Sequence, residues 1–405
     1  MTAITTHTED RTAAPEGTAS TDNAPAMWVE RLTLTDFRSH ASLSHTFDAR
    51  PVVLTGPNGA GKTNLIEAIS LLAPGQGLRR APYPEIARTG TDAWAVAARV
   101  HTPAGRIDIG TGLTGAGAAS NRTGRTVRID GEPQSGSGIL ADYVEMIWLT
   151  PAMDGLFTGS GTERRRFLDR MILCFDPGYR TRVNQFERAM AQRNRLLEDG
   201  VREPARLEGL EIVMAETGVA IAAARAEAVA ALATTIAARR ARAAASAFPW
   251  AMLMLEGRLE RELAQRPAVE VEDQYARALA TGRERDRGAG RALDGPHRSD
   301  LIVGHGPKSA PARQCSTGEQ KALLVGLVLA HAELIAERQG GAAPILLLDE
   351  IAAHLDAARR AALFDEIVAL GTQAWMTGTD QEAFEALGQR AQSLRLGPAG
   401  EPLTS

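Results

Sequence analysis

The spacing of apolar residues near the two ends of the chain predicts alternating strands and helices. Strand-like apolar runs cover residues 29–37 and 52–55. After the second run, apolar residues recur at the period of a helix with one buried face, at Leu65, Ile66, Ile69 and Leu72. Toward the other end, the pattern predicts strands at 345–348 and 374–377 around a helix at 357–370. We therefore expect an α/β fold.

The middle of the chain has a different pattern. Residues 95–150 indicate further strands, with a hairpin turn at Asp130 and Gly131. Residues 162–279 are dominated by Ala, Arg, Glu and Leu, with apolar positions at helical spacing. This stretch is too short and too irregular in its heptads for a long coiled coil, so it predicts a compact helical lobe. The polar residues 282–291 are expected to form a flexible return.

These patterns divide the chain into four parts. Residues 1–26 are rich in Thr, Ala, Pro and acids and contain no Leu, Val or Phe, so we expect a disordered N-terminal tail. Residues 27–150 and 291–405 are expected to form one α/β unit, and residues 151–290 an inserted helical lobe.

Charge and composition narrow the classes of function. The net charge is −4, so no overall positive field indicates nucleic-acid binding, and a DNA role would need a local basic patch or a basic face made by assembly. Cys174 and Cys315 are far apart and are expected to be reduced thiols. We expect no apolar run long enough for a transmembrane helix, and the N-terminus lacks the pattern of a secretory signal. We expect a cytoplasmic protein without a membrane partner.

A glycine-rich loop between the second strand and the first helix is the strongest chemical signal. The loop and the residues that start the helix are Gly56, Pro57, Asn58, Gly59, Ala60, Gly61, Lys62, Thr63 and Asn64. This is a full P-loop match, in which backbone N–H groups and the helix N-terminus surround phosphates. Lys62 would reach the β- and γ-phosphates, and the hydroxyl of Thr63 would bind Mg²⁺. The loop predicts a nucleotide site.

Two acids follow the buried apolar strand at 345–348. Asp349 at the strand end would hold Mg²⁺, and Glu350 would polarise the attacking water as a general base. The alternative is an acidic strand end that caps the next helix. With a P-loop upstream, we favour the catalytic interpretation for Asp349, Glu350 and Lys62.

A third motif, Ser316-x-Gly318-x-Gln320, lies about 30 residues before the acidic strand. The hydroxyl of Ser316 and the N–H of Gly318 could open a helix that faces an anion. The alternative is a simple capping box, because Ser316 and Glu319 have the required spacing.

The order of the three motifs resembles the ATPase head of the ABC and SMC superfamily. A P-loop, a long helical insertion, a signature helix and an acidic strand follow one another. In that superfamily the signature serine binds the γ-phosphate of ATP held by the other protomer. The resemblance implies an ATPase lobe formed by residues 27–150 and 291–405, which sandwiches Mg²⁺-ATP against a second copy of the chain.

The chain resembles the RecF family of recombination mediators more closely still. The similarity extends over residues 29–377 and rests on short motifs in the same order. They are Leu32 with Phe37 and Arg38, residues 59–72, Gly75 to Arg80, Glu163 to Asp169, Gln192 to Asn194, Gly218 with Ile221 and Arg225, and Gly295 to Leu301. The motif from Glu163 to Asp169 is found in few other families.

Membership of that family implies a slow ATP-driven clamp on DNA. Two copies would close on ATP, bind double-stranded DNA near gaps or junctions with single strands, and reopen after hydrolysis. RecO- and RecR-type mediators would be partners in loading a recombinase. Two alternatives stay open here: the ATPase subunit of a membrane transporter, and an SMC-like structural protein. The motif at residues 163–169 counts against the first, and the short helical region against the second.

The chain departs from the family pattern at a few positions. Glu350 stands where many relatives carry Asp, and either acid can serve. Glu319 and Lys321 replace a more usual Gln and Arg, and Lys is a less planar partner for phosphate than Arg. Thr377 or Thr379 would occupy the position after the last strand where transporter ATPases carry a histidine.

Several basic residues are candidates for further phosphate contacts. Arg38 could reach the phosphates of ATP; the alternative is a salt bridge at the sheet edge. Two groups of arginines could contact DNA. The alternative is a structural role or a solvated helix face, and we favour a structural role for the first group. The two groups are Arg164, Arg165, Arg166 and Arg170, and Arg239, Arg240 and Arg242. His297 could contact a ligand or fix its own turn.

Overall fold

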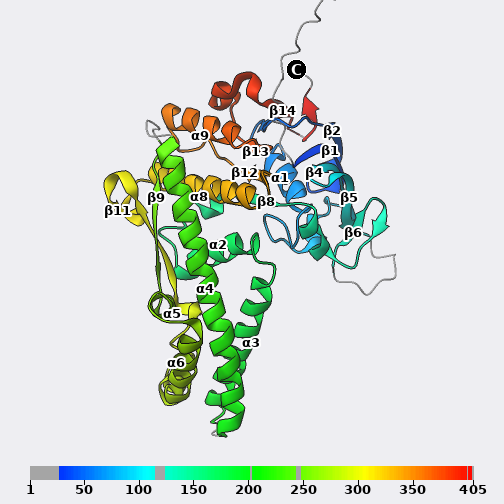
Figure 1. Cartoon of the computed structure of the whole chain (residues 1–405). Coiled ribbons are helices and arrows are strands. Elements are labelled where there is room, and N and C mark those ends of the chain that lie inside the picture. Colours follow the sequence, from blue (N-terminus) through cyan, green and yellow to red (C-terminus); the bar gives the residue numbers. More distant parts are fainter. Residues whose placement is uncertain (1–26, 115–123, 201–202, 243–247, 399, 404–405) are drawn as a thin grey trace, which may run out of the picture.

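The computed structural model describes residues 27–114, 124–200, 203–242, 248–398 and 400–403. The tail expected at residues 1–26 lies outside this part of the chain. Figure 1 shows the two sheets that carry the chain's N- and C-terminal parts on one side and a long helical lobe on the other. The α/β class expected from the sequence is confirmed.

A mixed six-stranded sheet forms the centre of the α/β part. Its members are β8 (Met146–Leu149), β12 (Ile345–Leu348), β13 (Ala374–Thr377), β3 (Val52–Thr55), β14 (Gln392–Leu396) and β15 (Pro402–Leu403). They lie in the order β15-β14-β3-β13-β12-β8, and all neighbours are parallel except β15 and β14. Parallel strands direct their carboxyl ends to one edge, so the ends of β3, β12 and β13 meet there.

A second six-stranded sheet is antiparallel throughout. It contains β1 (Trp28–Phe37), β2 (His40–Thr46), β4 (Trp94–Thr102), β5 (Gly105–Leu113), β6 (Thr126–Ile129) and β7 (Glu132–Pro133), in the order β2-β1-β4-β5-β6-β7. The hairpin expected at Asp130 and Gly131 joins β6 to β7, where Ile129 pairs with Glu132. The strand expected at residues 29–37 is also confirmed, because β1 spans Trp28–Phe37 and buries Val29, Leu32 and Leu34.

The two faces of the central sheet bury two separate cores. Val52, Leu54 and Trp375 face one core, together with helix α1 (Lys62–Ser70) and the antiparallel sheet. Val53 and Met376 face the other, together with helices α8 (Thr317–Arg338) and α9 (Ala357–Ala369) and the helical lobe. Successive strand residues point to opposite faces, which explains why the short strands are apolar throughout.

Helices supply most of the lobe. They are α2 (Gly161–Leu173), α3 (Tyr179–Glu198), α4 (Pro204–Arg242), α5 (Arg258–Leu263), α6 (Ala268–Thr281) and α7 (Arg283–Ala289). The 39 residues of α4 run the length of the lobe beside α3 (Figure 1). At 1.5 Å per residue this helix is about 58 Å long, so the lobe is elongated where the sequence suggested a compact one.

Helix α4 also corrects the expectation about apolar length. It contains a window with mean hydropathy 1.6, so it is long and apolar enough to span a membrane by those two measures. Half of that window is buried in the protein, where α4 packs on α3, α6 and α8. Alanine supplies much of the hydropathy, and the core helix of a globular protein can have the same composition.

Two segments of the lobe differ from the sequence-based expectation. Residues 251–256 form strand β9 (Ala251–Glu256), which pairs with β10 (Asp300–His305) across the expected boundary at residue 290, and β11 (Ala310–Pro311) completes a small antiparallel sheet. The return expected to be flexible at 282–291 contains helix α7. It is ordered because Asp286 is buried against Arg193 at 2.8 Å.

Candidate nucleotide site

The P-loop joins β3 to α1 at the carboxyl edge of the central sheet. Gly61 caps the helix with φ of 82°, and a Cβ there would lie 2.7 Å from the Ser39 hydroxyl, so the turn needs glycine. Pro57, Asn58 and Gly59 are exposed. The strand, loop and helix predicted from the sequence are therefore present, with an open loop ahead of a helix N-terminus.

Lys62 folds back over its own loop. Its ammonium donates to the carbonyl oxygens of Gly56, at 2.7 Å, and Pro57, at 2.9 Å. Burial lowers the pKa of Lys62, while the nearby carboxylates of Glu350, Asp349 and Asp380 act in the opposite direction. The cation and the two acids predicted from separate motifs thus share one site.

Asp349 links the P-loop helix to two strand ends. Its Oδ1 accepts hydrogen bonds from the Thr63 hydroxyl, at 3.0 Å, and from the Thr377 hydroxyl, at 2.7 Å. Asp349 is buried, with 5% of its surface exposed. A hydroxyl and a carboxylate oxygen side by side are the donors that Mg²⁺ takes from a P-loop protein, so this pair fits the ion.

The Mg²⁺ site would draw its other ligands from outside the protein. Within the described ranges, no group of three or more His, Cys, Asp or Glu side chains is arranged to hold a metal. Mg²⁺ usually keeps several waters and binds few protein groups next to nucleotide phosphates, which suits a site built on Thr63 and Asp349 alone.

Glu350 is exposed and has an unusual backbone. Its φ is 51°, in the left-handed region that non-glycine residues rarely adopt. Its N–H donates to the Thr377 hydroxyl at 2.7 Å, and its carbonyl oxygen accepts from Lys321 at 2.8 Å. A strained backbone held from both sides is typical of a functional position.

The signature motif forms the capping box that the sequence allowed as an alternative. The Ser316 hydroxyl accepts from the Glu319 N–H, and the Glu319 carboxylate accepts from the Ser316 N–H at 3.1 Å. Hydrogen bonding to Lys308 and to the Ser316 N–H lowers the pKa of Glu319 to about 2. Ser316 and Thr317 are nevertheless exposed, so the start of α8 remains accessible to a ligand.

Gly318 permits a close approach between the signature helix and the loop after Glu350. A Cβ on Gly318 would lie 2.7 Å from the backbone oxygen of His354. His354 has a left-handed φ of 65°. The glycine of this motif is therefore required by packing, apart from any contact with nucleotide.

Arg38 makes the salt bridge that was its alternative role. Its guanidinium donates to both Glu67 oxygens, at 2.9 and 2.6 Å, and to the Glu85 carbonyl. Glu67 lies on the P-loop helix, so the pair fixes α1 against the turn after β1. Contact of Arg38 with phosphate stays a prediction. Asn64 binds Ser39 and Arg79 through its side chain.

Three residues contribute to the site in ways that the sequence did not predict. Lys321 points inward, whereas its place in the signature suggested a contact with phosphate. Asp380 acts on Lys62 electrostatically from just beyond β13. His40 lies between the carbonyl oxygens of Gly61 and Gly400, and burial lowers its pKa. Only an acid following a parallel strand end could have pointed to Asp380 in advance.

The first arginine group is largely structural. Arg164 pairs with Asp300 at 2.7 Å, and Arg165 donates to the Ser299 carbonyl. The two acids nearest to these arginines in sequence have other contacts: Glu163 caps α2, and Asp169 pairs with Arg225. Burial lowers the pKa of Arg170 to about 10, whereas Arg166 is exposed. His297 bonds to the Ala292 carbonyl, which fixes its turn.

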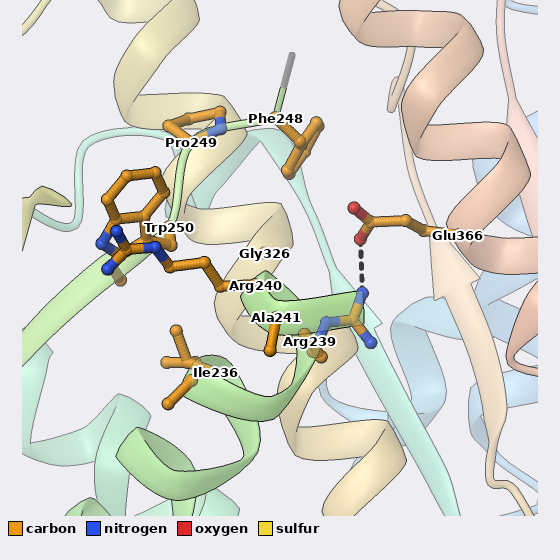
Figure 2. Close-up of a pocket in the computed structure, with 11 residues that line it drawn as sticks. Ile236, Arg239, Arg240, Ala241, Phe248, Pro249, Trp250, Gly326 and Glu366 are labelled. Carbon is orange, nitrogen blue, oxygen red and sulfur yellow. Dashed lines mark hydrogen bonds and ion pairs between the residues drawn. The ribbon is translucent and has the colours of Figure 1, made fainter. Parts of the chain in front are cut away.

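Arg239 and Arg240 of the second arginine group line a cavity of about 490 Å³ between α4, β9, α8 and α9. Figure 2 shows Arg239 directed at Glu366 and Arg240 over the Trp250 ring, 3.9 Å from the ring centre. Arg242 pairs with Glu333. Ion pairs thus engage two of these arginines within the chain, which favours the structural alternative for them.

Comparison with known proteins identifies the family. A family model described as the RecF/RecN/SMC N-terminal domain matches residues 28–394. The "DNA replication and repair protein RecF" of Mesorhizobium japonicum is 54% identical over 367 residues, which cover 90% of this chain and 95% of that protein. The chain belongs to the RecF family. The RecF of Agrobacterium fabrum is 53% identical over 92% of this chain and 97% of its own.

Solved structures agree with this family at the level of the fold. The chain is similar to the recombination mediator protein RecF with ATPrS in the RecFOR pathway, with a TM-score of 0.77, 19% identity and coverage of 94% and 98% of the two chains. An Smc head domain from Pyrococcus furiosus gives a TM-score of 0.53 at 16% identity over 93% and 96%. The ABC/SMC head fold implied by the motif order is confirmed.

Proposed function

We propose that this RecF-family chain is an ATP-switched DNA-binding protein of replication and recombinational repair. Two copies bind Mg²⁺-ATP between them and grip double-stranded DNA, including gapped DNA with single-stranded regions. Slow hydrolysis then releases the grip. The family membership supports the DNA role, and the solved relatives with ATP and ATPrS support the nucleotide.

The observation that carries the proposal is the convergence of Lys62, Thr63, Asp349 and Glu350 at one sheet edge. On ATP binding, Lys62 exchanges its loop carbonyls for β- and γ-phosphate oxygens. Thr63 and Asp349 hold Mg²⁺, which supplies charge neutralisation for the phosphates. The exposed carboxylate of Glu350 orients and deprotonates the attacking water.

The other half of each composite site is the start of α8. Ser316 is exposed and sits at a helix N-terminus, where backbone N–H groups and the helix dipole favour an anion. The γ-phosphate of ATP held by a second copy is that anion in our proposal, with Gly318 part of the same surface. The capping box is compatible with this role because it orders the helix start in advance.

The wider role follows from the relatives. The solved RecF structures belong to a pathway named RecFOR, so we expect RecO- and RecR-type proteins as partners in loading a recombinase at gaps. We also expect the protein to act in the cytoplasm, where the DNA lies.

DNA binding with defined nucleotide states tests this function. We expect gapped duplex to bind in Mg²⁺-ATP and to dissociate in Mg²⁺-ADP, with affinity falling as salt rises because phosphate contacts release counterions. Lys62→Met should lower ATP affinity by about tenfold or more, ~1.4 kcal/mol, and abolish the nucleotide effect. If duplex DNA neither binds nor changes hydrolysis in the wild-type protein, the proposed DNA role is refuted.

A further inference from the structure

Lys321 is a buried lysine close to the proposed general base. It lies on α8, five residues after Ser316, and only 2% of its surface is exposed. Its ammonium donates to the carbonyl oxygen of Glu350 at 2.8 Å and lies 3.4 Å from Asp154 Oδ2. A buried ammonium is costly without partners, and these two contacts offset that cost.

The bond from Lys321 completes a clamp on the Glu350 backbone. Thr377 accepts from the Glu350 N–H, and Lys321 donates to its carbonyl. Between these two bonds the residue is held at φ of 51°, a conformation that glutamate does not favour without support. The same Thr377 hydroxyl binds Asp349, so the clamp also ties the base to the Mg²⁺ ligand.

A second contact joins α8 to the same loop. The backbone oxygen of His354 lies so close to Gly318 that a Cβ there would approach it to 2.7 Å. Lys321 and Gly318 both lie within two turns of Ser316, and the helix between them buries Glu319 and Gln320. A rigid, well-packed helix start therefore connects Ser316 with the loop that carries Glu350.

We infer that Lys321 is a positioning residue that couples the signature helix to the hydrolytic base of its own chain. When Ser316 engages the γ-phosphate held by a second copy, the start of α8 is fixed, and Lys321 holds Glu350 with its carboxylate toward its own nucleotide. Each site then hydrolyses its ATP only when Ser316 of the same chain contacts ATP that is bound by the second copy. This inference rests on the proposed function and concerns the regulation of that site.

The test compares Lys321→Met with Lys321→Arg and with Arg338→Met in the full chain. Arg338 is the matched control, because it is an exposed cation in the last turn of the same helix. We expect Lys321→Met to bind ATP within about twofold of wild type and to hydrolyse it about 10- to 100-fold more slowly in single turnover. Lys321→Arg should recover part of the rate, and Arg338→Met should match wild type.

Two further variants separate positioning from packing. Asp154→Asn keeps the bond from Lys321 to the Glu350 carbonyl and should hydrolyse much faster than Lys321→Met. Lys321→Gln keeps a neutral hydrogen-bond donor, and we expect it to hydrolyse ATP at an intermediate rate. It takes the place of Lys321→Met in the comparison if that variant does not fold. The inference would be overturned if Lys321→Met hydrolyses ATP at the wild-type rate, or if Asp154→Asn loses as much rate as Lys321→Met. It would also be overturned if ATP affinity and melting temperature fall in proportion to the rate.

Hydrolysis in these experiments is measured without DNA. Failure of the wild type to bind DNA would therefore contradict the proposed function and leave the coupling intact. A wild-type protein that never hydrolyses ATP would overturn the coupling and the release step, while its ATP-dependent DNA binding would still be judged separately.

Discussion

Arg38 has an observed structural role, and its contact with phosphate is a prediction that can be tested. Its φ is 53°, and its guanidinium closes a two-point ion pair with Glu67 of the P-loop helix. Arg79 shares the same carboxylate at 3.2 Å. Because Arg79 also contacts Glu67, Arg38 could move to a phosphate and the Glu67 carboxylate would still have a cationic partner.

Replacement of Arg38 tests this possibility. If Arg38 reaches phosphate, Arg38→Ala lowers ATP affinity by about tenfold or more, since a charge-assisted bond is lost. Glu67→Gln removes only the ion pair and should leave affinity close to wild type. Calorimetric titration with ATP makes the comparison, and unchanged affinity in a folded Arg38→Ala protein would leave the salt bridge as the sole role.

His331 gives a pH dependence to folding. It lies fully inside the protein on α8, and burial lowers its pKa to about 4 from 6.5. The unfolded chain therefore binds the proton more readily between these values, so His331 makes stability fall as pH drops from about 6.5 toward 4. In urea unfolding, the free energy of unfolding of His331→Leu should fall less steeply than that of wild type as the pH drops. The two slopes should differ by at most ~1.4 kcal/mol per pH unit. An identical slope in the variant would contradict this.

Local sequence patterns predicted the identity of the main site residues but not all of their partners. Lys62 and Thr63 follow from loop spacing, and Asp349 from an acid after an apolar strand. Lys321 could not be read in the same way, because its two partners lie 29 and 167 residues away. The direction of its side chain depends on which strands become neighbours, and that is a property of the tertiary fold.

Among the elements of the lobe, α3, α4 and α7 are joined by a buried charge network. Arg193 is fully buried and donates to Glu211 at 2.9 Å, to Asp286 at 2.8 Å and to the Leu279 carbonyl at 2.7 Å. This network explains why the polar segment after α6 is helical. Sequence reasoning found the motif around Arg193 but could not assign its partners.

Removal of Arg193 should destabilise the whole chain. Arg193→Met leaves Asp286 buried without its close cation and leaves Glu211 to pair with Arg283, so we expect a cost of about 3–5 kcal/mol of unfolding free energy. Arg195→Met is the control on the same helix, because Arg195 is 84% exposed and pairs only loosely with Asp199, so its effect should stay within ~0.5 kcal/mol. Urea denaturation followed by circular dichroism compares them, and similar midpoints for both variants would refute the structural role.

Elements whose apolar residues recur at a clear strand or helix spacing were predictable from the sequence, and elements without such spacing were not. The run from β3 to α1 shows both a buried strand and a helical face within 20 residues, so its local order was clear. Strand β9 follows Ala- and Arg-rich sequence and is defined by pairing with β10, whose residues follow more than 40 positions later. Its existence depends on that distant partner.

At the scale of the whole molecule, ion pairs within the chain limit which arginines are available to bind DNA. The net charge is −4, and Arg164, Arg239 and Arg242 are engaged in ion pairs within one chain. A basic surface large enough for duplex DNA is therefore expected to be completed by a second copy. ATP-dependent dimerisation is the central claim, because both the composite nucleotide site and the DNA surface depend on it.

Sedimentation velocity of Glu350→Gln tests this claim most directly, because the variant should bind Mg²⁺-ATP and fail to hydrolyse it. We predict a monomer without nucleotide, a dimer in Mg²⁺-ATP, and a monomer again when Ser316→Arg is added, with ATP still bound to the P-loop. Glu350→Gln that binds ATP but sediments as a monomer at every concentration, or a dimer unaffected by Ser316→Arg, would contradict the account.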